Sequence, residues 1–183
     1  MLECLILGDS IAVGVGQARP ECVTRAIIGI TSARFLLTPL PARMAGTIII
    51  SLGANDTEAS VTGENVRTLR ASMSAPRVYW LLAAGSSAVR DAVRQVAASF
   101  RDRVIDIAPL VGSDGIHPDK VGYGHLADLT RSGGRLERDG GRSAYRAFPP
   151  PNVVYRSASP VSGTLRAPSE IRIWNGPNNP AGR

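Results

Sequence analysis

Ser10 and His117 are the residues whose types and surroundings best suit chemistry. A serine hydroxyl is a weak nucleophile until a neighbouring base takes its proton, and histidine does this best near neutral pH. The chain has only two histidines, and we expect His125 to lie within a helix, in a packing or surface role. His117 follows Asp114 by three residues, so a tight turn can bring the carboxylate to Nδ1–H and leave Nε2 free to face Ser10. These residues predict a nucleophile, a base and an orienting acid for acyl transfer.

Acyl transfer also needs hydrogen-bond donors aimed at the negative oxygen that develops on the substrate. We expect three such oxyanion donors: the backbone N–H of Ser10, the backbone N–H of Gly29 and the side-chain amide of Asn55. Each of these residues also has an ordinary structural interpretation, as a helix cap or a turn former. Asp9 and Asp56 are expected to brace their loops by hydrogen bonds to the backbone.

Short apolar runs, often rich in β-branched residues, alternate with longer helical patterns along the chain. This alternation is typical of a parallel sheet buried between helices. The predicted strands are Glu3 to Leu7, Cys22 to Ile28, Thr47 to Leu52, Arg77 to Leu82 and Arg103 to Ile107. In such a sheet ligands bind beyond the carboxyl ends of the strands. The candidate residues follow four of the five strands, so the sequence places them at one rim.

The predicted helices cover Ile11 to Ala18, Ser32 to Met44 with breaks at two prolines, Gly63 to Met73, Ser86 to Phe100, and Pro118 to about Thr130. Pro118 suits a helix start because its missing N–H would be unpaired there. Gly14 and Gly16 have the spacing of the first two glycines of a dinucleotide-binding loop, but Arg19 stands where the third glycine is required. We therefore interpret both glycines as small residues of the first helix that face the sheet.

Four short blocks in a fixed order resemble those of the SGNH, or GDSL-like, hydrolases. They are GDS at 8–10, a single glycine at 29, GAND at 53–56 and DGIHP at 114–118, and the match spans residues 1 to about 130. The resemblance implies a three-layer α/β/α fold with a five-stranded parallel sheet of flavodoxin-like arrangement. It also implies Ser10 as nucleophile, Gly29 and Asn55 as oxyanion donors, and Asp114 with His117 as acid and base.

The resemblance further implies hydrolysis of short acyl or acetyl esters, on a carbohydrate, a lipid or a small molecule, without metal or organic cofactor. GDSI replaces GDSL at 8–11, a swap of aliphatic residues that affects packing more than chemistry. The segment 56–77 is too short to supply a lid, which predicts an open, shallow site for a small acyl group. An acyltransferase with the same residues, and a binding or structural module without turnover, remain alternatives.

The basic charge of the chain is concentrated at one end. Of 183 residues with a net charge of +6, residues 1–130 carry 12 basic and 12 acidic side chains, so the whole excess lies in 131–183. That segment is rich in Arg, Gly and Pro, which predicts a poorly ordered tail after a hydrolase domain at 1–130. Nucleic-acid binding would rest on this tail alone and is not favoured. Nothing in the sequence predicts an oligomeric state.

Cys4 and Cys22 are the only cysteines, and their spacing fits no metal site. A single bridge is possible, but we favour two buried thiols on apolar strands. The first residues show neither a basic segment nor a long apolar run of a signal peptide, and no stretch approaches the roughly 20 apolar residues of a membrane span. The expected compartment is the cytoplasm.

Overall fold

The apolar runs of the sequence form one parallel sheet. Its strands are β1 (Leu2–Gly8), β2 (Val23–Ala26), β3 (Ala45–Ser51), β4 (Arg77–Leu82) and β5 (Arg103–Asp106), in the order β2-β1-β3-β4-β5. The computed structural model describes residues 2–131. The five-stranded parallel α/β fold expected from the sequence is confirmed, with the strand order of flavodoxin-like folds.

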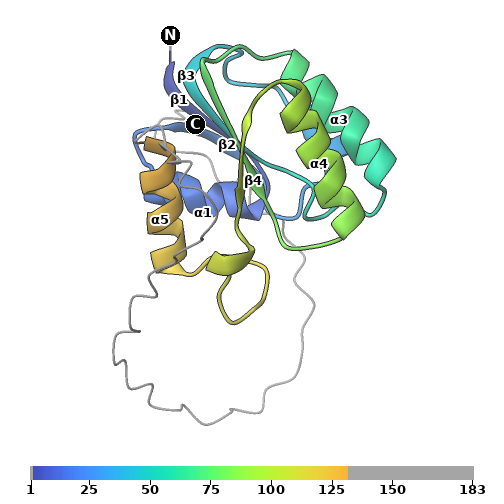
Figure 1. The fold of residues 1–183 in the computed structure, drawn as a ribbon. Helices are drawn as coiled ribbons and strands as arrows, with labels where there is room; N and C mark the ends of the chain where they lie inside the picture. Colours follow the sequence, from blue (N-terminus) through green and yellow to red (C-terminus); the bar gives the residue numbers. More distant parts are fainter. Residues whose placement is uncertain (1, 132–183) are drawn as a thin grey trace, which may run out of the picture. The chain divides into compact units, whose positions relative to one another are not determined.

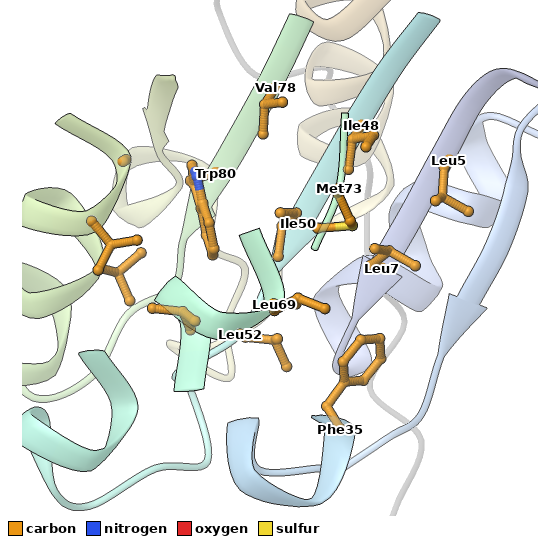
Figure 2. Close-up of a cluster of buried hydrophobic side chains, with 14 of the residues drawn as sticks. Leu5, Leu7, Phe35, Ile48, Ile50, Leu52, Leu69, Met73, Val78 and Trp80 are labelled. Carbon is orange, nitrogen blue, oxygen red and sulfur yellow. The ribbon is translucent and has the colours of Figure 1, made fainter. Parts of the chain in front are cut away.

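Helices cover both faces of the sheet. On one side lie α1 (Ser10–Ala18) and α5 (Lys120–Arg131), and on the other lie α3 (Ala59–Ala71) and α4 (Ser87–Ser99), as Figure 1 shows. The short helix α2 (Ser32–Leu36) belongs to the second layer, where Phe35 packs under the sheet (Figure 2). The three central strands therefore bury both faces, which explains the nearly continuous apolar runs of β1, β3 and β4.

Alternation along the strands divides the core into two clusters. Leu7 and Ile50 point toward α2 and α3, where they meet Phe35 and Leu69 (Figure 2). Ile6, the neighbour of Leu7, points the other way and joins the cluster under α1. Full burial of one such aliphatic side chain contributes about 1.5–3 kcal/mol, so this pattern resists any slip of strand register.

The strand order changes direction between β1 and β3. From β1 the chain proceeds through α1 to β2 on one side, and it later returns to form β3 on the other side of β1. The helices that follow β1 and β3 cover opposite faces of the sheet, so the ends of these two strands form the switch point at which open α/β sheets bind their ligands. Ser10 begins the helix on one side of this switch point.

Most helix boundaries differ from the predicted ones by one or two residues, and three of the differences have an evident cause. The second helix ends at Leu36, because the following segment with its two prolines does not continue it. Helix α3 begins at Ala59 instead of Gly63, because its first turn lacks the apolar periodicity on which the prediction rested. Pro118 lies before the last helix, not at its start, and forms an isolated antiparallel bridge with Val111.

Cys4 and Cys22 form a disulfide, so the interpretation of two free buried thiols was wrong. The register of β1 and β2 pairs Leu5 with Val23, which sets the two preceding cysteines side by side, with their Cα atoms 4.8 Å apart. Parallel strands at this separation satisfy the geometry that a disulfide requires. The bridge closes a loop that contains all of α1 and therefore Ser10.

The predicted tail begins where the described residues end. Arg131 is the last residue of α5, and its Nε lies 3.0 Å from Glu21 Oε1. The rest of 131–183 lies outside the described residues, so the lack of order predicted for this basic segment stays a prediction. Within 2–131, no helix combines the length and apolar character needed to cross a membrane.

Candidate active site

Ser10 is the first residue of α1, directly after the turn that ends β1. Asp9 precedes it as the N-cap, and its side chain accepts a hydrogen bond from the Ile11 N–H at 3.0 Å. Gly8 has φ of +136°, and a Cβ there would overlap the carbonyl oxygen of Ser51. Only glycine therefore lets the chain turn so close to β3, and this turn presents Ser10 at the carboxyl edge of the sheet.

Asp9 supports this turn from inside the protein. Its Oδ1 also accepts a hydrogen bond from Ser51 Oγ at 2.9 Å, and its N–H donates to the Ser51 carbonyl at 3.0 Å. The side chain is fully buried, and Oδ2 has no hydrogen-bond partner within 2–131. Burial raises the pKa of Asp9 to about 6, although the hydrogen bonds from Ser51 and the helix backbone lower it. Asp9 braces the loop, as the sequence predicted.

Ser10, His117 and Asp114 form one hydrogen-bonded chain. Ser10 Oγ lies 2.8 Å from His117 Nε2, and His117 Nδ1 lies 2.8 Å from Asp114 Oδ2. Because an ionised carboxylate only accepts, Nδ1 must carry a proton, and in the neutral ring Nε2 is then the acceptor for the Ser10 hydroxyl. The turn predicted from the three-residue spacing thus places Asp114 at Nδ1 of His117 and leaves Nε2 facing Ser10.

Asp114 is held in its ionised form by its own loop. Its Oδ1 accepts the N–H groups of Ile116 and His117, each at 2.9 Å. These backbone hydrogen bonds, followed by the hydrogen bond to the His117 ring, lower the pKa of Asp114 to about 2. The Gly112 N–H closes the loop by donating to the His117 carbonyl at 2.7 Å. The acid and the base therefore sit on one short, self-contained loop.

Gly29 and Asn55 lie at the ends of the two strands that flank β1. Asn55 Nδ2 donates to the Ile30 carbonyl at 3.0 Å, which joins the loop after β3 to the loop that carries Gly29. The Ile27 N–H donates to the Gly8 carbonyl at 2.9 Å and holds that loop against the turn before Ser10. Neither Gly29 nor Asn55 hydrogen-bonds to Ser10 in the described part of the chain.

The three expected oxyanion donors keep unused hydrogens. Among residues 2–131, no hydrogen bond is made by the backbone N–H of Ser10 or by that of Gly29. The Asn55 amide nitrogen has two hydrogens and donates one of them to the Ile30 carbonyl. Gly29 and Asn55 are both exposed residues.

Asp56 holds the start of α2 against the loop after β3. Both of its carboxylate oxygens lie within 3.2 Å of the Ser32 N–H at the start of α2, and Asn65 Nδ2 donates to Ser32 Oγ at 3.0 Å. Asp56 thus anchors the loop after β3 to the end of the loop after β2. This is the bracing role predicted from the sequence.

The site is open. The side chain of His117 is 38% exposed and that of Asp114 is 51% exposed. The described residues include no group of three or more His, Cys, Asp or Glu side chains arranged to hold a metal ion. His125 is an exposed residue of α5 and takes no part in the hydrogen-bonded chain.

The chain is similar to solved structures, but its sequence matches no known family. No family model matches the chain, and no curated protein matches it. One similar solved structure is a protein from Bacteroides fragilis provisionally described as an acylhydrolase, at 18% identity and a TM-score of 0.51, covering 72% of this chain and 86% of that one. At this identity the likeness establishes the fold, in agreement with the three-layer arrangement that the resemblance implied.

A second similar structure is the C-terminal catalytic domain of peptidoglycan O-acetyltransferase A from Streptococcus pneumoniae, which carries a methylsulfonyl adduct. It has 15% identity and a TM-score of 0.50, and the match covers 72% of this chain and 93% of that domain. Both neighbours are named for acyl chemistry, so the fold of this chain is one that acyl-handling enzymes use.

Two residues near the site were not singled out from the sequence. Ser51 ends β3 and donates to Asp9, and only the strand pairing reveals that contact. Tyr123 packs against Gly14, whereas Gly16 contacts Thr24 of β2. Only one of the two glycines therefore faces the sheet as expected. A glycine one turn after Ser10 was the available signal that another side chain lies over that part of α1.

Proposed function

We propose that the chain is a serine-dependent ester hydrolase that works through a covalent acyl-enzyme. The observation that carries the proposal is the chain of two 2.8 Å contacts from Ser10 Oγ through His117 to Asp114. A helix N-cap role would explain a serine near this position, but the N-cap is Asp9, and Ser10 directs its hydroxyl to a histidine instead. An exposed loop histidine would likewise not require a partner on each ring nitrogen.

In the proposed reaction Ser10 Oγ attacks the ester carbonyl while His117 Nε2 takes the hydroxyl proton. The carbonyl oxygen becomes negative and is stabilised by the Ser10 and Gly29 N–H groups and the second amide hydrogen of Asn55. The tetrahedral intermediate collapses as His117 returns the proton to the departing alcohol, which leaves the acyl group on Ser10. Water then repeats the sequence, with His117 as base, and releases the acid.

The substrate class follows from the openness of the site and from the family resemblance. Both favour a small acyl group, acetyl above all, on an alcohol that remains largely outside the protein. The reaction above moves only protons and the acyl group between protein side chains, substrate and water, so it calls for neither a redox cofactor nor a metal. Asp114 stays ionised throughout the neutral range, since its pKa is about 2, and it stabilises the imidazolium that forms on His117.

Acetyl transfer to an alcohol is the second candidate function. It is favoured by the structural likeness to a domain named as a peptidoglycan O-acetyltransferase. The two reactions share the acyl-enzyme and differ only in whether water or an alcohol accepts the acyl group. Product analysis after adding a sugar or polyol acceptor to the reaction separates them. An acetylated acceptor as the main product would favour the transferase.

The test of the proposal is hydrolysis of p-nitrophenyl acetate by the wild type and by Ser10→Ala. Loss of a triad nucleophile leaves little more than the contribution of the oxyanion donors, so we expect a fall in kcat of at least about 10³-fold. Ser99→Ala is the matched control, because Ser99 is the last residue of α4 and its hydroxyl donates to the Val96 carbonyl and accepts a hydrogen bond from Arg67, with no contact to Ser10 or His117.

Covalent labelling provides a second readout. Phenylmethylsulfonyl fluoride should add one sulfonyl group to the wild type and to Ser99→Ala, and none to Ser10→Ala, as measured by intact-protein mass. Equal hydrolysis rates and equal labelling in wild type and Ser10→Ala would favour the non-catalytic module instead.

The disulfide also bears on the compartment. Structural disulfides persist mainly in oxidising compartments and are rare where thioredoxin and glutathione keep thiols reduced. We therefore propose an oxidising compartment in place of the cytoplasm expected from the sequence. Thiol trapping with a maleimide at the moment of cell lysis tests this. Two labelled cysteines per chain would contradict the oxidising compartment and favour the cytoplasm.

A further inference from the structure

Tyr123 of α5 occupies the space above α1 that a side chain at Gly14 would fill. A Cβ on Gly14 would overlap the Cζ and Cε1 atoms of the Tyr123 ring and would lie 2.6 Å from its hydroxyl oxygen. The phenolic end of the ring thus rests directly on the backbone of α1. Helix α1 allows this contact only because residue 14 is glycine.

The position of Gly14 places the Tyr123 hydroxyl close to Ser10. Residues 10 and 14 are four apart on α1, so they lie on the same face of the helix one turn apart, with Cβ positions about 5–6 Å from each other. Since the hydroxyl oxygen is 2.6 Å from the Cβ position of Gly14, it lies within about 9 Å of the Ser10 Cβ. That gap suits the alcohol part of a small ester bound to Ser10.

Tyr123 lies on the histidine side of the proposed reaction centre. The candidate oxyanion donors Gly29 and Asn55 follow β2 and β3, whereas Tyr123 belongs to the segment that carries His117 and packs with the α1 cluster. In ester hydrolysis the histidine protonates the departing alcohol, so the alcohol must leave on its side. Tyr123 therefore neighbours the leaving group and not the carbonyl oxygen.

The Tyr123 hydroxyl remains a hydrogen-bond donor at all relevant pH values. Partial burial, and then the negative charges of Asp9 and Asp114, raise the pKa of Tyr123 to about 12. The hydroxyl makes no hydrogen bond within the described residues. Its oxygen is also not one of the fully buried polar atoms without a partner. A partly buried ring about one helical turn from Ser10, whose protonated hydroxyl has no partner among residues 2–131, is suited to bind a polar group of a ligand.

We propose that Tyr123 is a substrate-positioning residue whose hydroxyl donates a hydrogen bond to an oxygen on the alcohol part of the ester. The site would thereby prefer esters of polyhydroxylated alcohols, such as sugars and glycols, over esters of apolar alcohols of the same size. The inference rests on the proposed ester hydrolase function and specifies its leaving-group side.

The experiment compares two isosteric esters, ethylene glycol monoacetate and propyl acetate, which differ by a hydroxyl in place of a methyl group on the alcohol. One neutral hydrogen bond corresponds to about fivefold in kcat/KM, so the wild type should prefer the glycol ester by about that factor. In Tyr123→Phe the ratio of the two kcat/KM values should fall to near one. Gly14→Ala retains the hydroxyl but displaces the ring, and it should lower the ratio in the same way.

Tyr79→Phe is the matched control. It also removes a phenolic hydroxyl, but from a buried tyrosine at the opposite end of the sheet, where the hydroxyl accepts a hydrogen bond from Arg103 at 3.0 Å. The ratio of the two kcat/KM values should therefore stay at the wild-type value. A Tyr123→Phe variant that slows both esters equally, or leaves the ratio unchanged, would overturn the inference while Ser10→Ala remains inactive. A Ser10→Ala variant as active as the wild type would overturn the proposed function and this inference with it.

Discussion

Reduction of the Cys4–Cys22 disulfide should destabilise the protein by an amount that can be worked out from the chain. The bridge joins residues separated by 18 positions. In the chain-entropy model a cross-link that closes a loop of this length stabilises the folded state by about 3 kcal/mol, because it limits the freedom of the unfolded chain. For a folded unit of about 130 residues, an entropy of unfolding near 2.1 cal/mol/K per residue converts this loss to a fall in Tm of roughly 10 °C.

The measurement is thermal unfolding followed by circular dichroism, with and without a phosphine reductant. The control is the double variant Cys4→Ala/Cys22→Ala, whose Tm should not respond to the reductant, so that any unspecific effect of the reagent is subtracted. Titration of the unreduced, denatured wild type should find no free thiol. Two free thiols per chain, or equal responses of wild type and double variant, would refute the disulfide and the stability assigned to it.

Three substitutions extend these expectations. Asp114→Asn keeps an acceptor oxygen for the backbone but turns an amide NH2, which is a donor, toward His117 Nδ1, so kcat for p-nitrophenyl acetate should fall by about 10²–10⁴-fold with little change in Tm. The pKa of Asp9 is about 6 in the folded protein and 3.8 in the unfolded chain, so the wild type loses stability as Asp9 ionises between about pH 4 and pH 6. Asn at position 9 does not ionise. The Tm of Asp9→Asn relative to that of the wild type should therefore rise over that pH range and stay level above it. Gly8→Ala sets a Cβ against the Ser51 carbonyl and should destabilise by about 4 kcal/mol or more in urea unfolding, and a loss below 1 kcal/mol would contradict the described turn.

The strands and the candidate residues were accessible from the sequence because each depends on local information. Apolar runs of four to seven residues show where a buried strand lies, and residues such as Ser10 and Asn55 stand out because they follow such runs directly. The contact between Asp114 and His117 was predictable for the same reason, since three residues of one loop decide it.

The contacts between distant segments were not accessible in this way. Cys4 and Cys22 meet only because β1 and β2 are neighbours in a particular register, and neither strand order nor register can be read from a spacing. Tyr123 illustrates the same limit, since the sequence shows a glycine at 14 but not which side chain fills the space above it. The start of α3 was predicted wrongly for a local reason, because its first turn carries no apolar period.

The two halves of the candidate site are built in different ways, and this has consequences for variation. Ser10 depends on the core: it is held by Gly8 and by Asp9, whose side chain is fully buried, and it lies inside the disulfide loop. His117 and Asp114 depend mainly on their own exposed loop, whose hydrogen bonds are formed among neighbours in sequence. Changes beneath Ser10 should therefore lower stability and activity together, because the same contacts fold the turn and aim the hydroxyl. Changes in the loop should alter activity with little loss of stability, which makes that loop the part of the site where chemistry can be retuned independently of the fold.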